Sequence, residues 1–308
     1  MANYSPTPAG TGNPNNAEQA EQAVGYISRW FVQALFPYRK TDDQVRTVQS
    51  GRDRITVMSD LGLPYGKYPR LIMAYLITAA VERAGQVELG LMTVEEARRI
   101  PLGRSMNAFL RNLGLGVRGS GGKTGNRTAI REQLSRLAGS TITVRKLYST
   151  RDKGMNAPIS KKWDLWFDPE HPDQDAITES FIELTEDFWE QINAAPIPID
   201  LDVLQALGKP RAMDLYVWLT LKKFWLAKRP EVSYEFNWED LAGQFSTKEL
   251  TTTDDRMNFR KELRKALTDV TRLWPDVRTE ATPTGFLIHD GAPSVRIKPA
   301  RRQPQIEQ

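Results

Sequence analysis

Apolar side chains recur every three or four positions in several stretches of the chain, which is the spacing of amphipathic helices. This spacing predicts two long helices, at residues 69–84 and 210–228. Each begins with a Pro-Arg pair, and proline suits the first turn of a helix because its missing N–H is not needed there. The same spacing predicts an earlier helix over residues 23–36, with an inward face made of Val24, Ile27, Phe31 and Leu35.

The two long helices open two similar orders of elements. A short helix is predicted after each, at residues 105–113 and 237–245, and both begin at a good helix cap, Ser105 or Asn237. A polar turn and a third helix follow in both copies. The inward residues of the third helices are Ile130, Leu134 and Leu137, then Phe259, Leu263 and Ala266. The first copy is longer, and residues 91–100 are its obvious insertion.

Strand-like sequence follows the third helix of each copy. In the first, residues 141–144 lead through a turn at residues 151–160 into residues 162–167, where apolar and polar side chains alternate. In the second, residues 277–281 turn into residues 286–288. This order of helices and hairpin is that of a winged helix. The expected fold is therefore α+β, with two tandem winged-helix domains related by an internal duplication.

These elements divide the chain into five expected segments. Residues 1–22 are rich in proline, asparagine and glycine and contain few apolar groups, so we expect a disordered tail. The remaining segments are an N-terminal winged-helix domain with its extra helix at residues 23–167, an acidic connecting segment at residues 168–207, a C-terminal winged-helix domain at residues 208–290, and a basic tail at residues 291–308.

The composition narrows the possible chemistry. Of 308 residues, 40% are hydrophobic and 26% are charged, as in soluble globular proteins. The chain has no cysteine and two histidines, His171 and His289, which excludes disulfides and thiolate metal sites and disfavours a histidine-rich metal centre. The longest mainly apolar run, residues 71–81, is too short to span a bilayer, and no signal peptide is evident. We expect a cytoplasmic protein without membrane contact, metal or cofactor.

The charges are sorted along the chain. Residues 118–162 contain eleven Lys and Arg against two acids, whereas residues 165–207 contain eleven acids and no Lys or Arg. Blocks of one sign create a surface field, and a positive field favours a polyanionic partner. The basic block therefore points to nucleic acid, with a solvated surface as the alternative. For the acidic block the hypothesis is that it directs DNA to the basic faces by repulsion.

The third helix of each copy has the character of a recognition helix. In the first copy, Arg127 and Arg131 stand four positions apart, so they share a face opposite the apolar stripe. Lys123, Asn126 and Thr128 surround the start of that helix, where recognition helices contact bases. The second copy has a denser basic face, made of Arg256, Arg260, Lys261, Arg264 and Lys265. An ordinary solvated helix face is the alternative for both.

The presumed first wing is also basic. A wing that reaches over the DNA backbone uses such residues for phosphate contacts, which position the protein without reading sequence. The candidate phosphate contacts are Arg145, Lys146, Arg151, Lys153, Lys161 and Lys162.

No catalytic residues are expected. The glycine-rich residues 119–125 resemble part of a nucleotide-binding P-loop, but Val117 stands where the motif requires its first glycine, and the phrase follows a helix instead of a strand. The acidic pairs have no partner that would suggest acid–base or metal chemistry. An enzyme that nicks DNA would need paired histidines for a metal and a tyrosine nucleophile, and His171 and His289 stand alone.

Four phrases together resemble the plasmid-encoded RepA family of replication initiators, and the resemblance runs from about residue 60 to 290. The phrases are LPYGKYPRL at residues 63–71, LGRSMNAFLRNLGL at residues 102–115, IREQLSRL at residues 130–137 and AMDLYVWL at residues 212–219.

The resemblance implies a protein that binds repeated sequences (iterons) in double-stranded DNA at a plasmid origin. It further implies opening of the adjacent duplex and recruitment of host replication proteins, the initiator and the helicase, without catalysis by the chain itself. Similar initiators bind as monomers at origin repeats and as dimers at an operator, so a homodimer is a further expectation. Two alternatives remain open: a winged-helix transcriptional repressor, and an origin-acting ATPase or primase.

Overall fold

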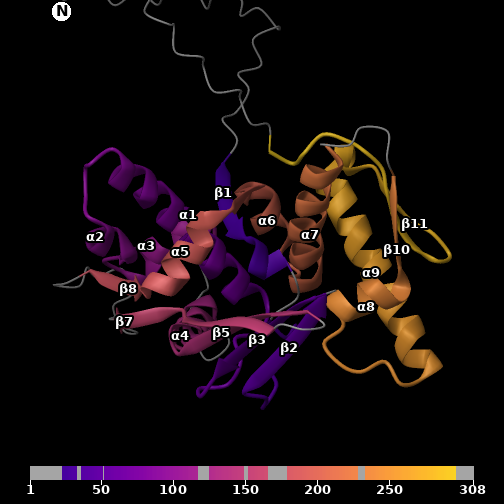
Figure 1. Cartoon of the computed structure of the whole chain (residues 1–308), viewed down its shortest axis with the longest axis horizontal. Helices are drawn as coiled ribbons and strands as arrows, with labels where there is room; N and C mark the ends of the chain where they lie inside the picture. The colour runs from indigo at the N-terminus through magenta and orange to yellow at the C-terminus, as the bar shows by residue number, and fades with distance from the viewer. Residues whose placement is uncertain are drawn as a thin grey trace, which may run out of the picture.

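The fold is described from a computed structural model, which covers residues 23–32, 36–50, 52–116, 125–148, 152–165, 179–227 and 233–295. The expected tail at residues 1–22 and most of the basic tail at residues 291–308 lie outside these ranges, as do Lys123 and Arg151. Helices and strands are mixed throughout the described part of the chain, which confirms the α+β class (Figure 1).

The helices of both copies form where the sequence predicts them. The long helices are α1 (Lys67–Glu88) and α7 (Pro210–Leu226). The short helix α3 (Met106–Asn112) begins at Ser105, whose Oγ accepts a hydrogen bond from the Ala108 N–H at 3.3 Å. Its counterpart α8 (Trp238–Phe245) begins at Asn237, whose Oδ1 accepts from the Asp240 N–H at 2.8 Å. The third helices are α4 (Asn126–Ala138) and α9 (Thr253–Leu273).

Residues 23–32 do not form the predicted helix. They form the strand β1 (Val24–Ser28) and a 3-10 helix, η1 (Arg29–Val32). Leu35, the last residue of the predicted stripe, lies outside the described residues. β1 pairs antiparallel with β9 (Pro196–Asp200). Gly25 lies close to Leu201, so that a Cβ atom added to Gly25 would come within 2.5 Å of the Leu201 side chain. The backbone of this segment is thus paired with a strand far along the chain, a contact that helical spacing cannot reveal.

A four-stranded antiparallel sheet lies in the N-terminal half, with the order β2-β3-β5-β6. Its strands are β2 (Val45–Ser50), β3 (Asp53–Ser59), β5 (Ser140–Leu147) and β6 (Asp152–Pro158). The predicted turn at residues 151–160 is therefore wrong, because most of it is strand β6, which pairs with β5. Glycine and asparagine in this segment suggested a turn, but residues 152–158 are held extended by strand β5.

A second sheet in this half has the order β4-β8-β7. Its strands are β4 (Arg99–Gly103), β7 (Ser160–Asp164) and β8 (Ser180–Leu184). The predicted hairpin between residues 141–144 and 162–167 is thus wrong, since β7 pairs with β8 and not with β5. The insertion at residues 91–100 contains the short helix α2 (Val94–Arg98), which begins with the capping box of Thr93 and Glu96.

Residues expected in the acidic connecting segment are part of this packed half. β8 is the central strand of its sheet, and it lies between β4 and β7. The helix α5 (Glu186–Ala194) packs on α1 and buries Phe188, Trp189 and Ile192. β9 then pairs with β1, and α6 (Leu201–Leu207) leads to α7. Of the acids in these elements, Glu186, Asp187, Glu190 and Asp202 are exposed, Glu183 is half-buried and Asp200 is buried.

The C-terminal half contains α7, α8, α9 and a third sheet. Its strands are β10 (Tyr234–Asn237), β11 (Thr279–Ala281) and β12 (Gly285–Ile288), and a 3-10 helix, η2 (Pro275–Val277), precedes β11. The order is β10-β12-β11, so the predicted hairpin is present. Both three-stranded sheets therefore place the first strand at one edge, the third in the middle and the second at the other edge.

Candidate nucleic-acid interface

α9 presents a basic face to solvent. Its buried side consists of Phe259, Leu263, Ala266, Leu267 and Val270, which pack toward α7. Four of the five predicted contact residues lie on the exposed side, because the helical repeat places them away from that stripe. The four exposed residues are Arg256, Lys261, Arg264 and Lys265, and Arg260 is half-buried.

Arg260 and Arg264 are held in place by an aromatic ring. Their guanidinium carbons lie 5.6 Å and 4.9 Å from the centroid of Trp238, the first residue of α8. Trp238 is itself fixed, since its Nε1–H donates to the carbonyl oxygen of Pro283 at 2.9 Å. Arg264 also donates to the carbonyl oxygen of Thr282 at 3.5 Å. Cation–π stacking of this kind orients the planar guanidinium groups and leaves their N–H groups available to phosphate.

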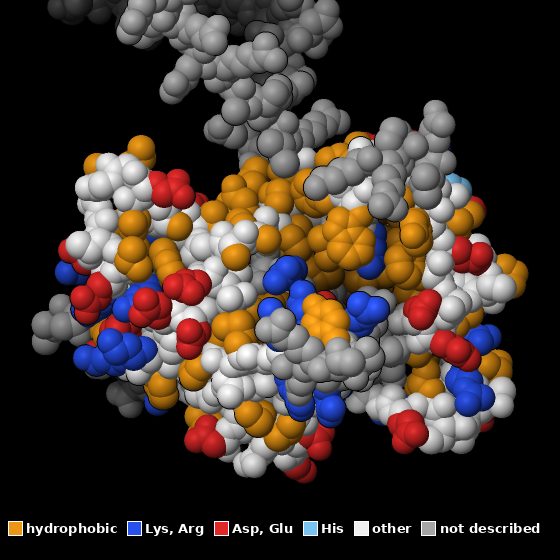
Figure 2. Space-filling view, in the orientation of Figure 1, with side chains coloured by type: hydrophobic (Ala, Val, Ile, Leu, Met, Phe, Trp, Pro, Cys, Tyr) orange, Lys and Arg blue, Asp and Glu red, His pale blue; other side chains and the backbone are white. Residues whose placement is uncertain are grey.

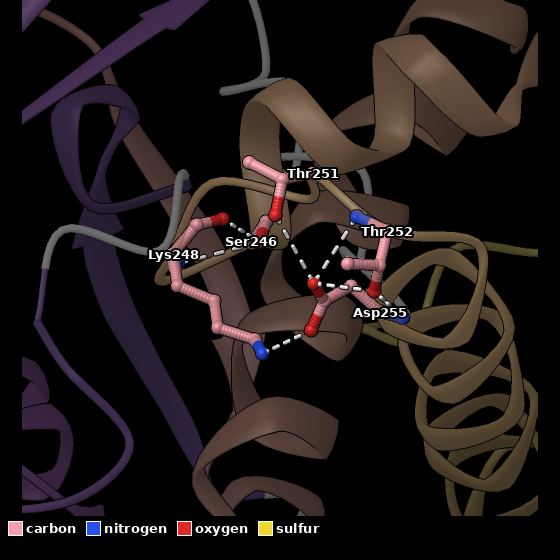
Figure 3. Close-up of polar contacts among 5 residues, drawn as sticks. All are labelled: Ser246, Lys248, Thr251, Thr252 and Asp255. Atoms are coloured by element: carbon pink, nitrogen blue, oxygen red, sulfur yellow. Dashed lines mark hydrogen bonds and ion pairs between the residues drawn. The ribbon is translucent and has the colours of Figure 1, made fainter.

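A polar network around Asp255 fixes the start of α9 (Figure 3). The Thr252 N–H donates to Asp255 Oδ2 at 3.3 Å, and the Asp255 N–H donates back to Thr252 Oγ1 at 3.1 Å, which is a capping box. The Lys248 ammonium forms an ion pair with the other carboxylate oxygen. The hydrogen bonds from Lys248 and Thr252 lower the pKa of Asp255 to about 2. The turn before the helix is therefore tied to its first turn.

α4 presents a smaller polar face. Ile130, Leu134 and Leu137 are buried, and Thr128 and Arg131 are exposed on the other side. The two remaining predicted residues at the start of the helix are engaged by neighbours. The Arg127 Nε–H donates to Asn107 Oδ1 at 3.1 Å, which ties α4 to α3, and Asn126 Oδ1 accepts from the Tyr68 hydroxyl at 2.5 Å.

An acid in the middle of α4 lies among basic and phenolic groups. Glu132 accepts a hydrogen bond from the Tyr65 hydroxyl at 3.0 Å and forms ion pairs with Lys40 at 3.3 Å and Arg136 at 3.0 Å. Partial burial opposes its ionisation, but these hydrogen bonds and charges outweigh that cost and lower the pKa of Glu132. α4 is therefore attached through Glu132 to the segment that carries Lys40.

The predicted wing residues lie on two different sheets. Arg145 and Lys153 are exposed on β5 and β6, and Lys146, which stands opposite Lys153 in the register, is half-buried. Lys161 and Lys162 are exposed on β7, where Lys161 forms an ion pair with Glu183 at 3.3 Å. These residues therefore do not form the single hairpin surface that the sequence predicted.

Sequence reasoning missed basic residues that the sheet brings beside Arg145. Arg54 of β3 stands directly opposite Arg145 in the register, and Arg52 precedes the same strand. Alternation of Ile55 and Val57 with polar residues was the available signal for β3. Because strands β3 and β5 are distant in sequence, their neighbouring arginines could only be found from the pairing.

The two halves meet at a pocket of mixed charge. Its lining includes Tyr38 and Arg39 from the segment between η1 and β2, Lys209 and Arg211 at the start of α7, and residues of α9. Lys209 is already paired with Asp269 at 2.8 Å. Figure 2 shows Lys and Arg side chains gathered near the centre of this face, between the N-terminal and C-terminal halves.

The residues that the structure describes contain no group of three or more His, Asp or Glu that could hold a metal ion. None of the described helices is long and apolar enough to cross a membrane.

Comparison with known proteins gives a family match. Residues 63–240, more than half of the chain, match the family model described as plasmid-encoded RepA protein. A search of curated proteins finds no match. Among solved structures, a crystal structure of domains 2 and 3 of RctB is similar with 12% identity over 77% of this chain and 84% of that chain, at a TM-score of 0.44. Another structure of RctB domains 2-3 has 11% identity over 83% and 85%, at a TM-score of 0.45. The chain belongs to the family of plasmid-encoded RepA proteins, the replication initiators that its sequence resembles.

Proposed function

We propose that the chain starts plasmid replication by binding direct repeats in double-stranded DNA through two winged-helix units. The units are α1 to β8, with the β5-β6 hairpin as an insertion, and α7 to β12. Their common strand order, β4-β8-β7 and β10-β12-β11, supports a duplication, although it is a different hairpin from the one that the sequence suggested. α4 and α9 are then the recognition helices.

The observation that carries this proposal is the basic outer face of α9. A recognition helix must bury one side on its own domain and present the other to the groove, with its first turns free to approach the bases. α9 meets these requirements: Phe259 and Leu263 are buried, Arg256 and Lys261 are exposed, and the start of the helix is fixed by its capping box. α4 gives weaker support to the proposal, because Arg131 is the one exposed arginine among the described residues of this helix.

The later steps follow from membership of the initiator family and are part of the proposal. After binding the repeats, the protein promotes opening of the adjacent duplex and recruits the host initiator and helicase. It acts without catalysis and without a cofactor, in the cytoplasm, and a homodimer forms when it binds an operator. The exposed acids of α5, Glu186, Asp187 and Glu190, repel DNA and so direct it to the basic helices.

A footprinting experiment tests the two recognition helices. The DNA is the duplex that the full chain selects most strongly from a randomised pool, or the repeats of its own plasmid origin. We expect R127A/R131A to remove protection in one half of the footprint and R260A/R264A to remove it in the other half. R272A is the matched control, because Arg272 is exposed at the opposite end of α9. Equal loss over the whole site in both variants, or no selected sequence, would contradict the proposal.

A further inference from the structure

The first turns of α9 project beyond the body of the C-terminal half. They lie at its lower right edge in Figure 1, past the end of α8. The first residue of the helix that enters the core is Phe259, which is 5% exposed. Arg256, Met257 and Asn258, which precede it, are all exposed. Residues 256–258, the part of the helix that would enter a DNA groove, therefore do not belong to the hydrophobic core of the described fold.

Arg260 and Arg264 are poorly placed to read bases. Both guanidinium groups stack on Trp238, and Arg264 also reaches the hairpin through Thr282. Stacked in this way, they face the junction of α8 and the hairpin, which suits contacts with the DNA backbone. Reading of base edges then falls to side chains on the projecting turns.

Met257 is the apolar member of that projecting group and is 62% exposed. A single exposed apolar side chain is common and needs no explanation by itself. Its position is informative, however, because recognition helices contact bases through residues near their start. In the major groove the one apolar feature that distinguishes a base is the C5-methyl group of thymine, and apolar side chains read it by contact.

We propose that Met257 reads a thymine by packing against its C5-methyl group in the major groove. This inference rests on the proposed function, in which α9 enters that groove. Arg256 and Lys261, the basic residues around it, would attract the phosphate backbone of the DNA, and this attraction does not depend on the DNA sequence. Met257 would therefore contribute specificity at one base pair and only a small part of the total affinity.

Deoxyuridine scanning tests this contact directly. In the duplex that the full chain selects from a randomised pool, each thymine is replaced in turn by deoxyuridine, which removes only the methyl group. We expect one replacement to weaken binding of the wild-type protein about fourfold, the effect of losing about 0.8 kcal/mol of apolar contact. M257Q should bind the unmodified duplex about fourfold more weakly and should show no further loss at that thymine.

Two variants serve as controls. M257L keeps an apolar side chain and should keep the sensitivity to deoxyuridine. L91A removes another exposed apolar side chain, 72% exposed and near α2 at the opposite side of Figure 1, and should bind like the wild type. Because position 257 is exposed, M257Q should keep the wild-type melting temperature, which calorimetry can check.

The outcomes separate the inference from the proposed function. If wild type and M257Q show the same pattern of loss along the duplex, Met257 reads no methyl group and the inference is overturned, while sequence-specific binding by the chain stands. If the full chain enriches no sequence from the pool, the proposed function itself fails. Sensitivity at one thymine that disappears in M257Q and persists in M257L supports the contact.

Discussion

Arg70 of α1 and Asp214 of α7 form a buried ion pair that joins the two halves of the molecule. The Arg70 Nε–H and Nη2–H groups donate to the two carboxylate oxygens of Asp214, each at 2.6 Å. The Nη2 group also donates to the carbonyl oxygen of Phe36 at 2.8 Å. Both side chains are less than a tenth exposed. Such a bidentate pair fixes the angle between α1 and α7 and so the relative placement of α4 and α9.

Removal of one partner should be costly. R70M leaves the Asp214 carboxylate buried without its cation, and we expect a loss of about 3–5 kcal/mol in the free energy of unfolding. R70M/D214L removes both charges and should recover most of that loss, because it also removes the cost of desolvating them. Urea unfolding followed by fluorescence measures both. A loss below about 1 kcal/mol in R70M would show that the pair contributes little.

The stacked arginine Arg264 should act on phosphate. R264A should weaken DNA binding by a similar factor for every sequence and should reduce the slope of log affinity against log salt by about 0.9. Titrations by fluorescence anisotropy at several salt concentrations measure that slope. R272A should leave it unchanged, and a sequence-dependent effect of R264A would assign the side chain to base reading instead.

The capping box at the start of α9 should stabilise the projecting turns. T252A removes the Oγ1 that accepts from the Asp255 N–H, and loss of such a cap costs about 1 kcal/mol. Hydrogen exchange should show faster opening of the first turns of α9, with little change in α7. T253A, one position into the helix, is the neighbouring control. Equal exchange in T252A and wild type would mean that the cap is redundant.

Buried Lys223 of α7 should make stability depend on alkaline pH. It is 1% exposed and donates to the carbonyl oxygen of His289. Burial, helped by Arg278, lowers its pKa to about 8 from 10.5 in the unfolded chain. The unfolded state therefore binds more protons between these values, so stability should rise from pH 8 toward pH 10.

K223M separates this contribution from that of its neighbour. Burial also lowers the pKa of Lys222 to about 8, so the rise in melting temperature between pH 8 and pH 10 should be smaller in K223M than in wild type, but still present. Calorimetry across that range measures the difference. An identical rise in both proteins would show that Lys223 titrates normally.

Local signals in the sequence predicted the helices well. Ser105, Asn237 and the two Pro-Arg pairs mark helix starts that depend on the few residues around them. α3, α8 and α7 begin there, and α1 begins two residues before its Pro-Arg pair, at Lys67. The same holds for α9, whose buried stripe of Phe259, Leu263 and Ala266 was visible in its spacing.

Strand pairing was harder to predict because it depends on distant partners. Ile27 and Phe31 fit a helical stripe, but β1 gains its backbone hydrogen bonds from β9. Residues 151–160 were predicted to form a turn because they contain glycine and asparagine, although β5 holds residues 152–158 extended. For the candidate site, the exposed basic residues of α9 could be predicted from helical geometry. The stacking of Arg260 and Arg264 on Trp238 could not, since it depends on where the start of α8 lies relative to α9.

The central position of β8 has a practical consequence for anyone who divides this protein into pieces. A fragment that stops at residue 167, where the first unit seemed to end, would lack the middle strand of its sheet and the helix α5 that covers α1. Such a truncation would expose apolar surface and a bare sheet edge, and it should aggregate during expression. A cut after residue 200 retains β8, α5 and β9, and it is the shortest N-terminal piece with which separate DNA binding by α4 should be attempted.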